Sequence, residues 1–380
     1  MYIQAIFLWT VIKMSGSIYG KNFAISTWGE SHGPALGVVV DGCPAGILLN
    51  EEDIQKDLDR RKPGRTAYAT PRTEDDKVEI LSGVFEGKTT GTPISMIIYN
   101  KNQRSQDYGD IKDIYRPGHA DYAYDQKFGF RDYRGGGRSS GRETAARVAA
   151  GAIAKKILCF LGIHVLAYTL SIGDIEIQPS NFDVDEIYTN PLAMPDKEAA
   201  LKAQKFLDEL KEKGDSAGGI IECIIDGVPP GVGEPVFEKL DAALAKAIFS
   251  IGAVKGMEFG SGFKAARMTG SQNNDPLQVD DHGRVFKQSN NAGGITGGIS
   301  DGSPIVFRTA IKPTSSISIP QQSIDRTQGK NVEIVVKGRH DPIIVPRAVI
   351  VVEAMTAITL VDYLFQRILS RIDLIQKALQ

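Results

Sequence analysis

Hydrophobic residues recur along the chain with two different periods, which together predict both helices and strands. Helical spacing predicts helices over residues 51–61, 144–161, 197–213, 235–248 and 349–372. Alternating or β-branched runs predict strands over residues 23–27, 36–40, 78–84, 94–99, 165–172, 220–225, 305–311 and 332–337. Strands and helices do not alternate regularly and no GxGxxG turn joins them, so a Rossmann fold is not predicted.

One pattern occurs twice. Residues 38–46 and 224–231 are each a β-branched run that ends in Asp-Gly-x-Pro-x-Gly, and each is followed by a charged helical stretch. The pattern is typical of a strand that runs into a tight turn. We interpret it as an internal duplication, with chance recurrence of a common strand–turn pattern as the alternative. The sequence therefore predicts an α+β fold, one large domain of two related halves.

Four long polar stretches lie between these elements, at residues 60–76, 100–142, 273–303 and 312–330. Loops of this length are uncommon unless they are functional or disordered. Their content of arginine, histidine, serine and glycine predicts long functional loops.

The strongest local signal is the segment 116–142, which contains His119 and the arginines Arg116, Arg131, Arg134, Arg138 and Arg142. Ser140 to Glu143 has the spacing of a capping box at the start of the helix predicted from residue 144. A helix N-terminus flanked by arginines suits phosphate or carboxylate groups. The alternative is a capped helix whose arginines form surface salt bridges.

Three further motifs are candidates for chemistry. His32 lies in a Gly-Glu-Ser-His-Gly turn between two predicted strands, with an exposed turn as the alternative. Lys312-Pro-Thr-Ser-Ser follows a glycine-rich run and could bind a phosphoryl group, or be a solvated turn. Asp341 precedes a proline after Arg339 and His340, where an Asx turn is the alternative.

Composition excludes several functional classes. Hydrophobic residues make up 42% of the 380, charged residues 24%, and the net charge is −2, so no overall charge favours nucleic acid or a membrane. Three separated cysteines indicate a reducing compartment, and five histidines without ligand spacing predict no metal site. The apolar run from Tyr2 to Ile12 is shorter than the ~20 residues of a membrane span, and we interpret residues 1–13 as an N-terminal extension.

These observations predict a soluble enzyme that acts on a small phosphorylated or polycarboxylate substrate. Two other classes stay open on the residues alone. One is a phosphotransferase, which the lack of a Walker or kinase motif disfavours. The other is an RNA-binding module that uses the Arg-Gly segment, which the net charge disfavours.

Several motifs, in order, resemble the signature blocks of the chorismate synthase family. They are GESHG (29–33), DLDRRKPG (57–64), QRSQDY (103–108), RPGHAD (116–121), RDYRGGGRSSGRETAARVAAGAIAKK (131–156), SIGAVKG (250–256), NNAGGITGGIS (290–300), KPTSS (312–316) and GRHDP (338–342). The similarity covers residues 14–380. It implies helices between two antiparallel sheets, a cytoplasmic homotetramer, and reduced FMN as cofactor. It also implies a 1,4-anti elimination of phosphate from 5-enolpyruvylshikimate-3-phosphate that yields chorismate, in aromatic amino acid biosynthesis.

The resemblance also implies roles for single residues. His32 would protonate the departing phosphate, His119 would stabilise the reduced flavin, and Asp341 would act with the flavin in removing the C6 proton. Substrate or NADP anions would bind Arg61, Arg116 and Arg142. The residues expected to bind FMN are Arg138, Ser139, Ser140, Gly252, Ala253, Gly297, Lys312, Pro313, Thr314, Ser315, Ser316 and Arg339.

Two positions depart from the family pattern. Gly252-Ala253 stands where Asn-Ala or Pro-Ala is usual, and Ala67 stands where an arginine is common, with Arg65 nearby. The residues that would make the flavin contact at the first position and the anion contact at the second therefore differ from those usual in the family. The motifs are shared by relatives that reduce their own flavin with NADPH and by those that do not, so the role of NADPH as reductant stays open.

Overall fold

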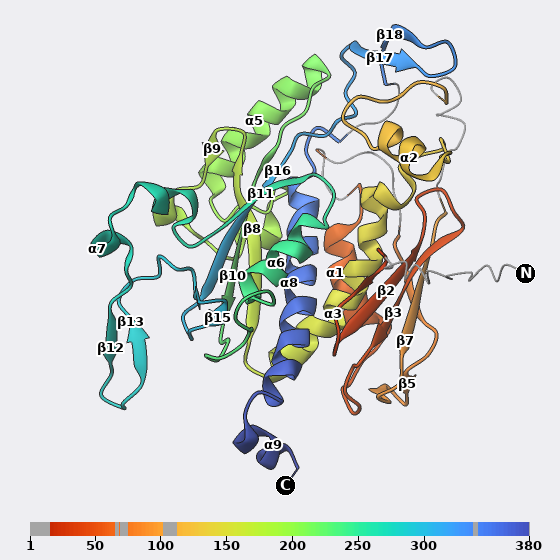
Figure 1. Cartoon of the computed structure of the whole chain (residues 1–380). Coiled ribbons are helices and arrows are strands. Elements are labelled where there is room, and N and C mark those ends of the chain that lie inside the picture. The colour runs from red at the N-terminus through yellow and green to blue at the C-terminus, as the bar shows by residue number, and fades with distance from the viewer. Residues whose placement is uncertain (1–15, 65–67, 69–74, 102–111, 337–340, 380) are drawn as a thin grey trace, which may run out of the picture.

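Two five-stranded antiparallel sheets form the outer layers of the fold (Figure 1). The computed structural model describes residues 16–64, 68, 75–101, 112–336 and 341–379. The first sheet has the order β1-β2-β3-β7-β4 and consists of Ile18–Tyr19, Ala24–Gly29, Ala35–Asp41, Ile94–Tyr99 and Val78–Ile80. The second has the order β11-β16-β10-β8-β9 and consists of Val254–Phe259, Ile305–Ile311, Gly219–Asp226, His164–Ile172 and Ile175–Glu176. The α+β class is confirmed.

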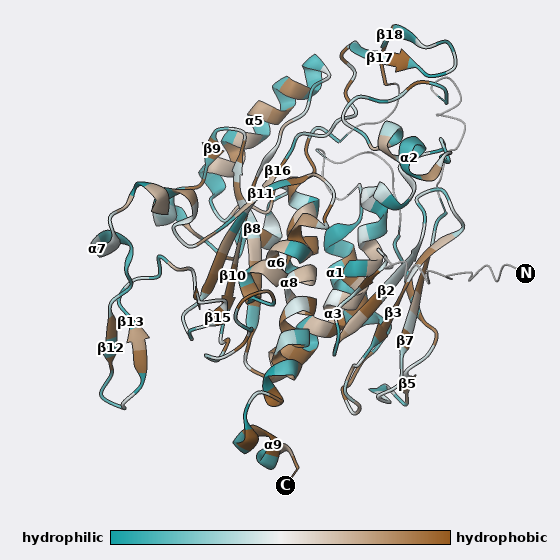
Figure 2. Ribbon diagram, viewed as in Figure 1, coloured by the Kyte–Doolittle hydropathy of each residue, from teal (hydrophilic) through white to brown (hydrophobic). Residues whose placement is uncertain are grey.

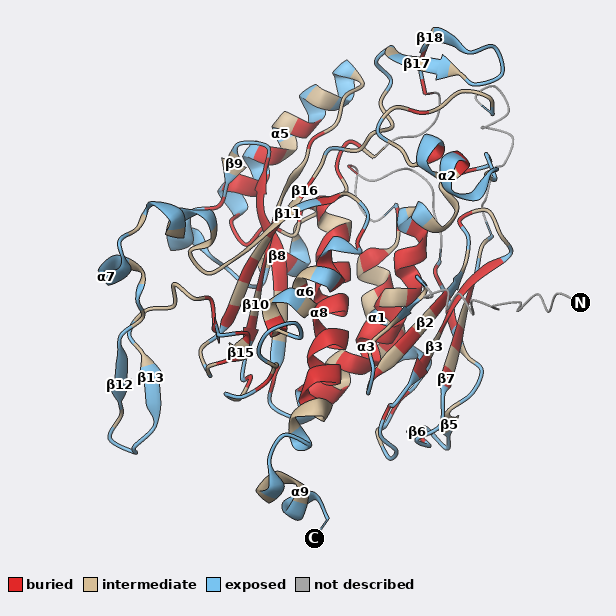
Figure 3. Ribbon diagram, viewed as in Figure 1, coloured by how far each residue is buried: buried red, intermediate tan, exposed pale blue. Residues whose placement is uncertain are grey.

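Four helices fill the space between the sheets: α1 (Glu51–Arg61), α3 (Thr144–Phe160), α6 (Leu240–Phe249) and α8 (Val345–Ile368). Helix α8 is long and apolar enough to span a membrane, but its apolar window is 94% buried inside the protein. It contacts helices on one side and the second sheet on the other, which explains why it is hydrophobic all round (Figures 2 and 3). Helix α8 is therefore a core helix.

Helices α3 and α8 approach each other closely at a glycine. A Cβ atom on Gly151 would lie 2.3 Å from the Cβ of Ala354, so only glycine fits there. Both helices begin at the same end of the molecule and run in the same direction (Figure 1). Helices α3 and α8 are therefore parallel and tightly packed, and their N-termini lie at the same end of the core.

A buried ionic cluster joins the three longest core helices. Glu353 of α8 is 1% exposed and accepts two hydrogen bonds from Arg60 of α1, at 2.8 and 2.9 Å, and one from Lys155 of α3, at 2.8 Å. Burial alone would raise the pKa of Glu353, but Lys155 and Arg60 outweigh it and hold that pKa below its ordinary value. The cluster fixes how the helices are positioned along one another.

Most predicted elements are present, with shifts at their ends. Helix α5 (Lys197–Lys213) is confirmed and alternates polar and apolar faces (Figure 2). The last helix begins at Val345, four residues before the prediction, because Pro346 is tolerated in a first turn. It ends at Ile368, and a separate helix α9 (Ile372–Ala378) follows. The predicted strand 78–84 was wrong as one unit, since β4 ends at Ile80 and β5 spans Val84–Phe85.

The long polar stretches hold more structure than the prediction of loops implied. Residues 100–142 contain α2 (Asp121–Phe128) and the 3₁₀ turn Gly137–Ser139, and a second 3₁₀ turn, Gly141–Glu143, begins at their end. Residues 273–303 form two hairpins, β12 (Leu277–Val279) with β13 (Val285–Lys287) and β14 (Ile295–Thr296) with β15 (Ile299–Ser300). A third hairpin joins β17 (Gln321–Asp325) to β18 (Lys330–Ile334). The remaining elements are β6 (Lys88–Thr89), α4 (Glu186–Thr189), α7 (Gly270–Asn273) and the 3₁₀ helices Pro179–Asn181 and Gly262–Arg267.

Candidate functional site

Three core helices have an end in the same region of the molecule. Helix α1 ends at Arg61, whose Nη2 donates to the carbonyl oxygen of Gly141 at 2.9 Å and whose Nε donates to Thr144 Oγ1 at 3.1 Å. Arg347, in the first turn of α8, donates from Nε to the carbonyl oxygen of Arg61 at 3.3 Å. The N-termini of α3 and α8 therefore lie beside the C-terminus of α1, and helix N-termini attract anions.

Two buried arginines share one carboxylate at this junction. Asp76 accepts from Arg61 Nη1 at 2.7 Å and also from Arg142 Nη1, while Arg142 Nε donates to Asn100 Oδ1 at 2.9 Å. Burial lowers the pKa of Arg61 to about 10, which leaves it protonated at neutral pH. The buried Nη2 atom of Arg142 has no hydrogen-bond partner among the described residues. This cluster carries more positive than negative charge, and an anion would balance it.

His119 lies against the Lys312–Ser316 segment, although 197 residues separate it from Ser316. Its Nδ1 is 3.0 Å from the carbonyl oxygen of Pro117, and its Nε2 is 3.0 Å from Ser316 Oγ. Burial, followed by the charge of Arg116, lowers the pKa of His119, so the imidazole is neutral at pH 7. In that form Nδ1 donates to the carbonyl and Nε2 accepts from the serine hydroxyl.

The Lys312–Ser316 segment also closes over the loop that carries His119. Lys312 Nζ donates to the carbonyl oxygen of Gly118 at 2.8 Å and to Ser315 Oγ at 2.7 Å. Burial and then Lys255 lower the pKa of Lys312, as expected for a cation without an anion beside it. The carbonyl oxygen of Thr314 accepts from Ser216. The buried Oγ1 of Thr314 has no partner in the described parts of the chain. Pro313 packs beside Gly218.

The SIGAVKG segment, residues 250–256, completes this group. The Lys312 amide donates to the carbonyl oxygen of Ala253 at 2.9 Å, and a Cβ on Gly252 would lie 3.9 Å from the carbonyl oxygen of Ser139. Ala253 has a φ of 73°, a conformation that costs a non-glycine residue energy. Three segments that were expected to bind FMN, around residues 138–140, 252–253 and 312–316, are therefore neighbours.

His32 lies in the turn between β2 and β3, at one end of the first sheet, as predicted. Its Nδ1 is 3.2 Å from Ser31 Oγ. Gly135 packs against the ring so closely that a Cβ there would lie 2.4 Å from Nδ1. The GESHG turn and the Arg-Gly segment are therefore in direct contact, which brings His32 to the arginine-rich loop.

Several arginines of that loop bind the protein itself. Arg116 donates from Nε and Nη2 to Asp121, at 2.8 and 2.7 Å, and Arg138 donates to Thr27 Oγ1 at 2.7 Å and to the carbonyl oxygen of Gly29 at 3.1 Å. Arg134 pairs with Asp132 and Arg131 donates to the carbonyl oxygen of Lys112. These guanidinium groups anchor the loop, which argues against an extended RGG tract for RNA.

The predicted capping box is only half correct. Ser140 Oγ accepts from the Arg142 amide at 3.3 Å and caps a 3₁₀ turn that leads into α3. Glu143 does not return to the Ser140 amide, because its carboxylate accepts from Thr27 Oγ1 at 3.0 Å and from Arg147 Nε at 2.8 Å. Ser139 Oγ donates to the carbonyl oxygen of Gly136 at 2.7 Å. Glu143 thus ties the loop to β2, a role that the sequence did not suggest.

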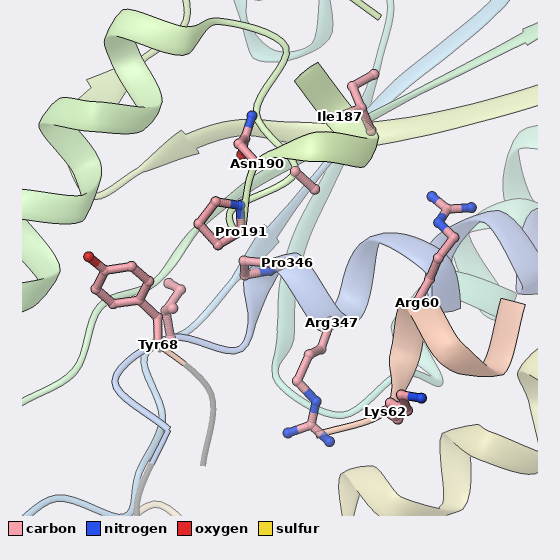
Figure 4. A pocket seen from close by; sticks show the side chains of 10 residues that line it. Arg60, Lys62, Tyr68, Ile187, Asn190, Pro191, Pro346 and Arg347 are labelled. Carbon is pink, nitrogen blue, oxygen red and sulfur yellow. The ribbon is translucent and has the colours of Figure 1, made fainter. Parts of the chain in front are cut away.

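Asp341 lies four residues before α8 and is paired with Arg347, whose Nη1 is 2.9 Å from Asp341 Oδ2. Arg339 and His340, the other expected residues of this motif, lie outside the described residues. Arg347 also lines a small pocket with Arg60, Lys62, Tyr68 and Asn190 (Figure 4). The pocket opens beside the junction of α1 and α8, next to the site.

Within one chain, Gly297 does not lie near the other residues that were expected to bind FMN. It lies in the turn between β14 and β15, before the first residue of β16, whereas Lys312 follows the last residue of that strand. Seven strand residues at about 3.3 Å each separate the two ends by roughly 20 Å. The contacts around Gly297, such as Leu240 with Gly298, belong to the opposite end of the sheet.

The amino-acid sequence is similar to a known protein family over most of its length. The family model described as chorismate synthase matches residues 23–365. The chorismate synthase of Lachnospira eligens is 62% identical over 364 residues, which cover 96% of this chain and 99% of that protein. The one from Methanococcoides burtonii is 54% identical over 355 residues, covering 93% and 97%.

A solved structure extends the comparison to three dimensions. The crystal structure of a chorismate synthase superimposes with a TM-score of 0.74 at 34% sequence identity, and the match covers 94% of this chain and 96% of that one. Sequence and fold therefore agree, and the chain belongs to the chorismate synthase family.

Proposed function

We propose that this protein eliminates phosphate from 5-enolpyruvylshikimate-3-phosphate in a 1,4-anti reaction that requires reduced FMN and yields chorismate. Its class is that of its family, a carbon–oxygen lyase that acts on phosphates. The observation that carries the proposal is the junction of α1, α3 and α8, where buried cations outnumber their carboxylate partners. The substrate has one phosphate and two carboxylates, and FMN adds a phosphate, which suits such a cluster.

The residues around the Lys312–Ser316 segment fit a flavin phosphate. The buried Thr314 hydroxyl has no partner among the described residues, and Lys312 beside it has a lowered pKa. Ser139, Gly252 and Ala253 line the same group of segments. When bound, reduced FMN supplies electron density that assists loss of phosphate with no net redox change.

The chain's own residues would handle protons and charge. His32 donates a proton to the departing phosphate, and Asp341 receives the proton that leaves C6. Arg142 offers its unpartnered Nη2 to a substrate anion, while the more buried Arg61 contributes charge and holds the start of α3. His119 is neutral before binding and becomes protonated beside the reduced flavin.

The two sheets support the proposed internal duplication. In the first sheet β3 is central, β2 precedes it, and α1, β4, β7 and α3 follow in the chain. In the second sheet β10 is central, β8 precedes it, and α6, β11, β16 and α8 follow. These four strands lie in the same order in both sheets, whereas the edge strands differ, since β1 precedes β2 in the chain and β9 follows β8. Gly42 and Gly227 of the repeated motif have φ values of 81° and 82°. We attribute this agreement to two related halves.

The remaining expectations are part of the same proposal. We propose a cytoplasmic homotetramer in which residues 1–13 lie outside the family fold. The β12–β13 hairpin exposes Leu277, Val279 and Val285 by 64–67%, which offers an apolar surface for another copy. Sedimentation at micromolar concentration tests the assembly.

The deciding experiment is anaerobic turnover of 5-enolpyruvylshikimate-3-phosphate with dithionite-reduced FMN, followed by phosphate release and chorismate absorbance. We expect turnover with reduced FMN and none with oxidised FMN alone. A third reaction with oxidised FMN and NADPH shows whether the protein reduces its own flavin. Folded protein that releases no phosphate with reduced FMN would refute the proposal.

A further inference from the structure

Arg347 connects the carboxylate of Asp341 to the end of a neighbouring helix. It is the third residue of α8, and its Nη1 donates to Asp341 Oδ2 at 2.9 Å. Its Nε donates at 3.3 Å to the carbonyl oxygen of Arg61, the last residue of α1. Figure 4 shows the Arg347 side chain reaching from α8 towards Lys62, just past the end of α1. One guanidinium group thus bridges α1 and Asp341.

The main chain on both sides of this contact is held in place. Helix α8 is buried from Ala348 to Leu364, which fixes its first turn relative to the core. The carbonyl oxygen of Pro342 accepts from the Ala217 amide at 2.9 Å, which attaches the residue after Asp341 to the segment that leads into β10. The last carbonyl oxygens of a helix lack partners inside the helix, and Arg347 satisfies one of them. The guanidinium therefore has a defined position from which to orient the carboxylate.

We propose that Arg347 is a positioning residue, which holds the Asp341 carboxylate in the orientation needed to receive the C6 proton. The inference rests on the proposed function. The side chains of Arg347 and Asp341 are only 24% and 15% exposed, so water replaces this pair poorly. A bidentate-capable guanidinium restricts a carboxylate more than an ammonium group does. An error of about 1 Å in such a group lowers a rate by roughly 100-fold.

The test compares Arg347→Met and Arg347→Lys with the wild-type protein, each assayed with reduced FMN. Methionine keeps the apolar stem but removes both donors. We expect kcat to fall by about 30- to 100-fold with KM changed by less than about threefold, since substrate binding does not use this pair. The deuterium isotope effect at C6 should increase on kcat, and lysine should restore part of the rate. Arg367→Met, in the last turn of the same helix, is the matched control and should behave as wild type.

A double-mutant cycle separates positioning from a general structural role. If Arg347 acts through Asp341, Arg347→Met in an Asp341→Asn background should cause little further loss. A full additional loss there, or loss of kcat with an unchanged isotope effect and a matching fall in thermal midpoint, would overturn the inference. Normal kcat in the folded Arg347→Met protein would also overturn it. Wild-type protein without turnover would instead refute the proposed function, so the two failures are distinguishable.

Discussion

At the scale of single residues, the two candidate histidines differ in their surroundings. His119 is held at both ring nitrogens, by Pro117 and Ser316, whereas His32 has Ser31 at Nδ1 and packs on Gly135. A ring held at both nitrogens suits a fixed electrostatic role. A ring in a turn at the end of a sheet suits proton donation. The two should therefore fail in different ways when substituted.

His32→Ala should lower kcat by roughly 100- to 10,000-fold and change KM much less, because a proton given to the departing phosphate matters only during bond cleavage. Steady-state kinetics with reduced FMN measure both constants. His282→Ala, in an exposed turn beyond β12, is a suitable control. Near-normal turnover of His32→Ala at neutral pH would rule out the acid role.

The lowered pKa of His119 predicts that binding of reduced FMN takes up a proton. An anion beside the imidazole would raise that pKa from below its ordinary value of 6.5, so at pH 7 the ring gains a proton on binding. The apparent dissociation constant should therefore increase as the pH rises. Calorimetry in two buffers of different ionisation enthalpy measures the uptake, which His119→Asn should abolish. Equal proton uptake in wild type and variant would contradict this assignment.

The sequence indicated which residues could belong to the site, but it did not indicate which residues contact one another there. His32, His119 and the Lys312–Ser316 segment are visible as motifs, because polar residues between glycines are rare in a core. Asp76, Asn100 and Arg347 were missed, since each is an ordinary polar residue until the fold places it against an arginine or Asp341. Such contacts join positions up to 286 residues apart, so they cannot be predicted from spacing along the chain.

At the scale of elements, the buried cluster of Glu353 with Arg60 and Lys155 determines how the core helices fit together. Glu353→Gln would remove a buried carboxylate from Arg60 and Lys155, which are only 20% and 24% exposed but keep Asp57 as a partner, so a loss of about 1–3 kcal/mol is expected. Urea unfolding should show this loss. Glu238→Gln, which removes an exposed pair with Lys21, should cost well under that amount. A cost of Glu353→Gln no larger than that of the control would contradict the role of the cluster.

The same carboxylate predicts how stability depends on pH. The folded pKa of Glu353 lies below its ordinary value of 4.5, so its contribution is fully present above pH 4.5 and is lost as the pH falls through the folded pKa. The gap in unfolding free energy between wild type and Glu353→Gln should therefore narrow below pH 4.5. A gap that stays constant down to the acid transition would contradict this.

Element boundaries show what periodicity can and cannot predict. Helix α5 was predicted correctly because Asp196 caps its start, Gly214 ends it, and its apolar positions have a clear helical period. Helix α8 was misplaced by four residues at its start, because it is buried all round and a uniformly apolar run has no period to locate its ends.

At the scale of the whole molecule, the layered fold was expected only through the family resemblance, since hydrophobic patterns do not specify which sheet a strand joins. The short repeat at residues 38–46 and 224–231 was the one direct sign, and both copies lie at the central strand of a sheet. Gly297 shows that a family motif alone does not locate a residue in the site. Its motif matches the family, but within the single chain it lies at the end of β16 opposite to Lys312.

The proposed N-terminal extension is tested by a protein that starts at Met14. The family model begins its match at residue 23, so this truncation should keep the reaction, the assembly and the thermal midpoint of the full chain. Activity and sedimentation of the two forms provide the comparison. Loss of solubility or turnover in the shorter form would show that residues 1–13 belong to the functional protein.

The parallel arrangement of α3 and α8 has a thermodynamic consequence. Two helices that run side by side in the same direction place their positive ends together, so like partial charges repel across the closely packed pair (Figure 1). An anion at this end would relieve the repulsion in the native state only, so substrate, product and even inorganic phosphate should act as folding ligands. At a concentration 100 times its dissociation constant, such a ligand adds about 2.7 kcal/mol to the free energy of unfolding. The resting enzyme would then be least stable when its metabolic supply is lowest, which links the lifetime of the protein to flux through its own reaction.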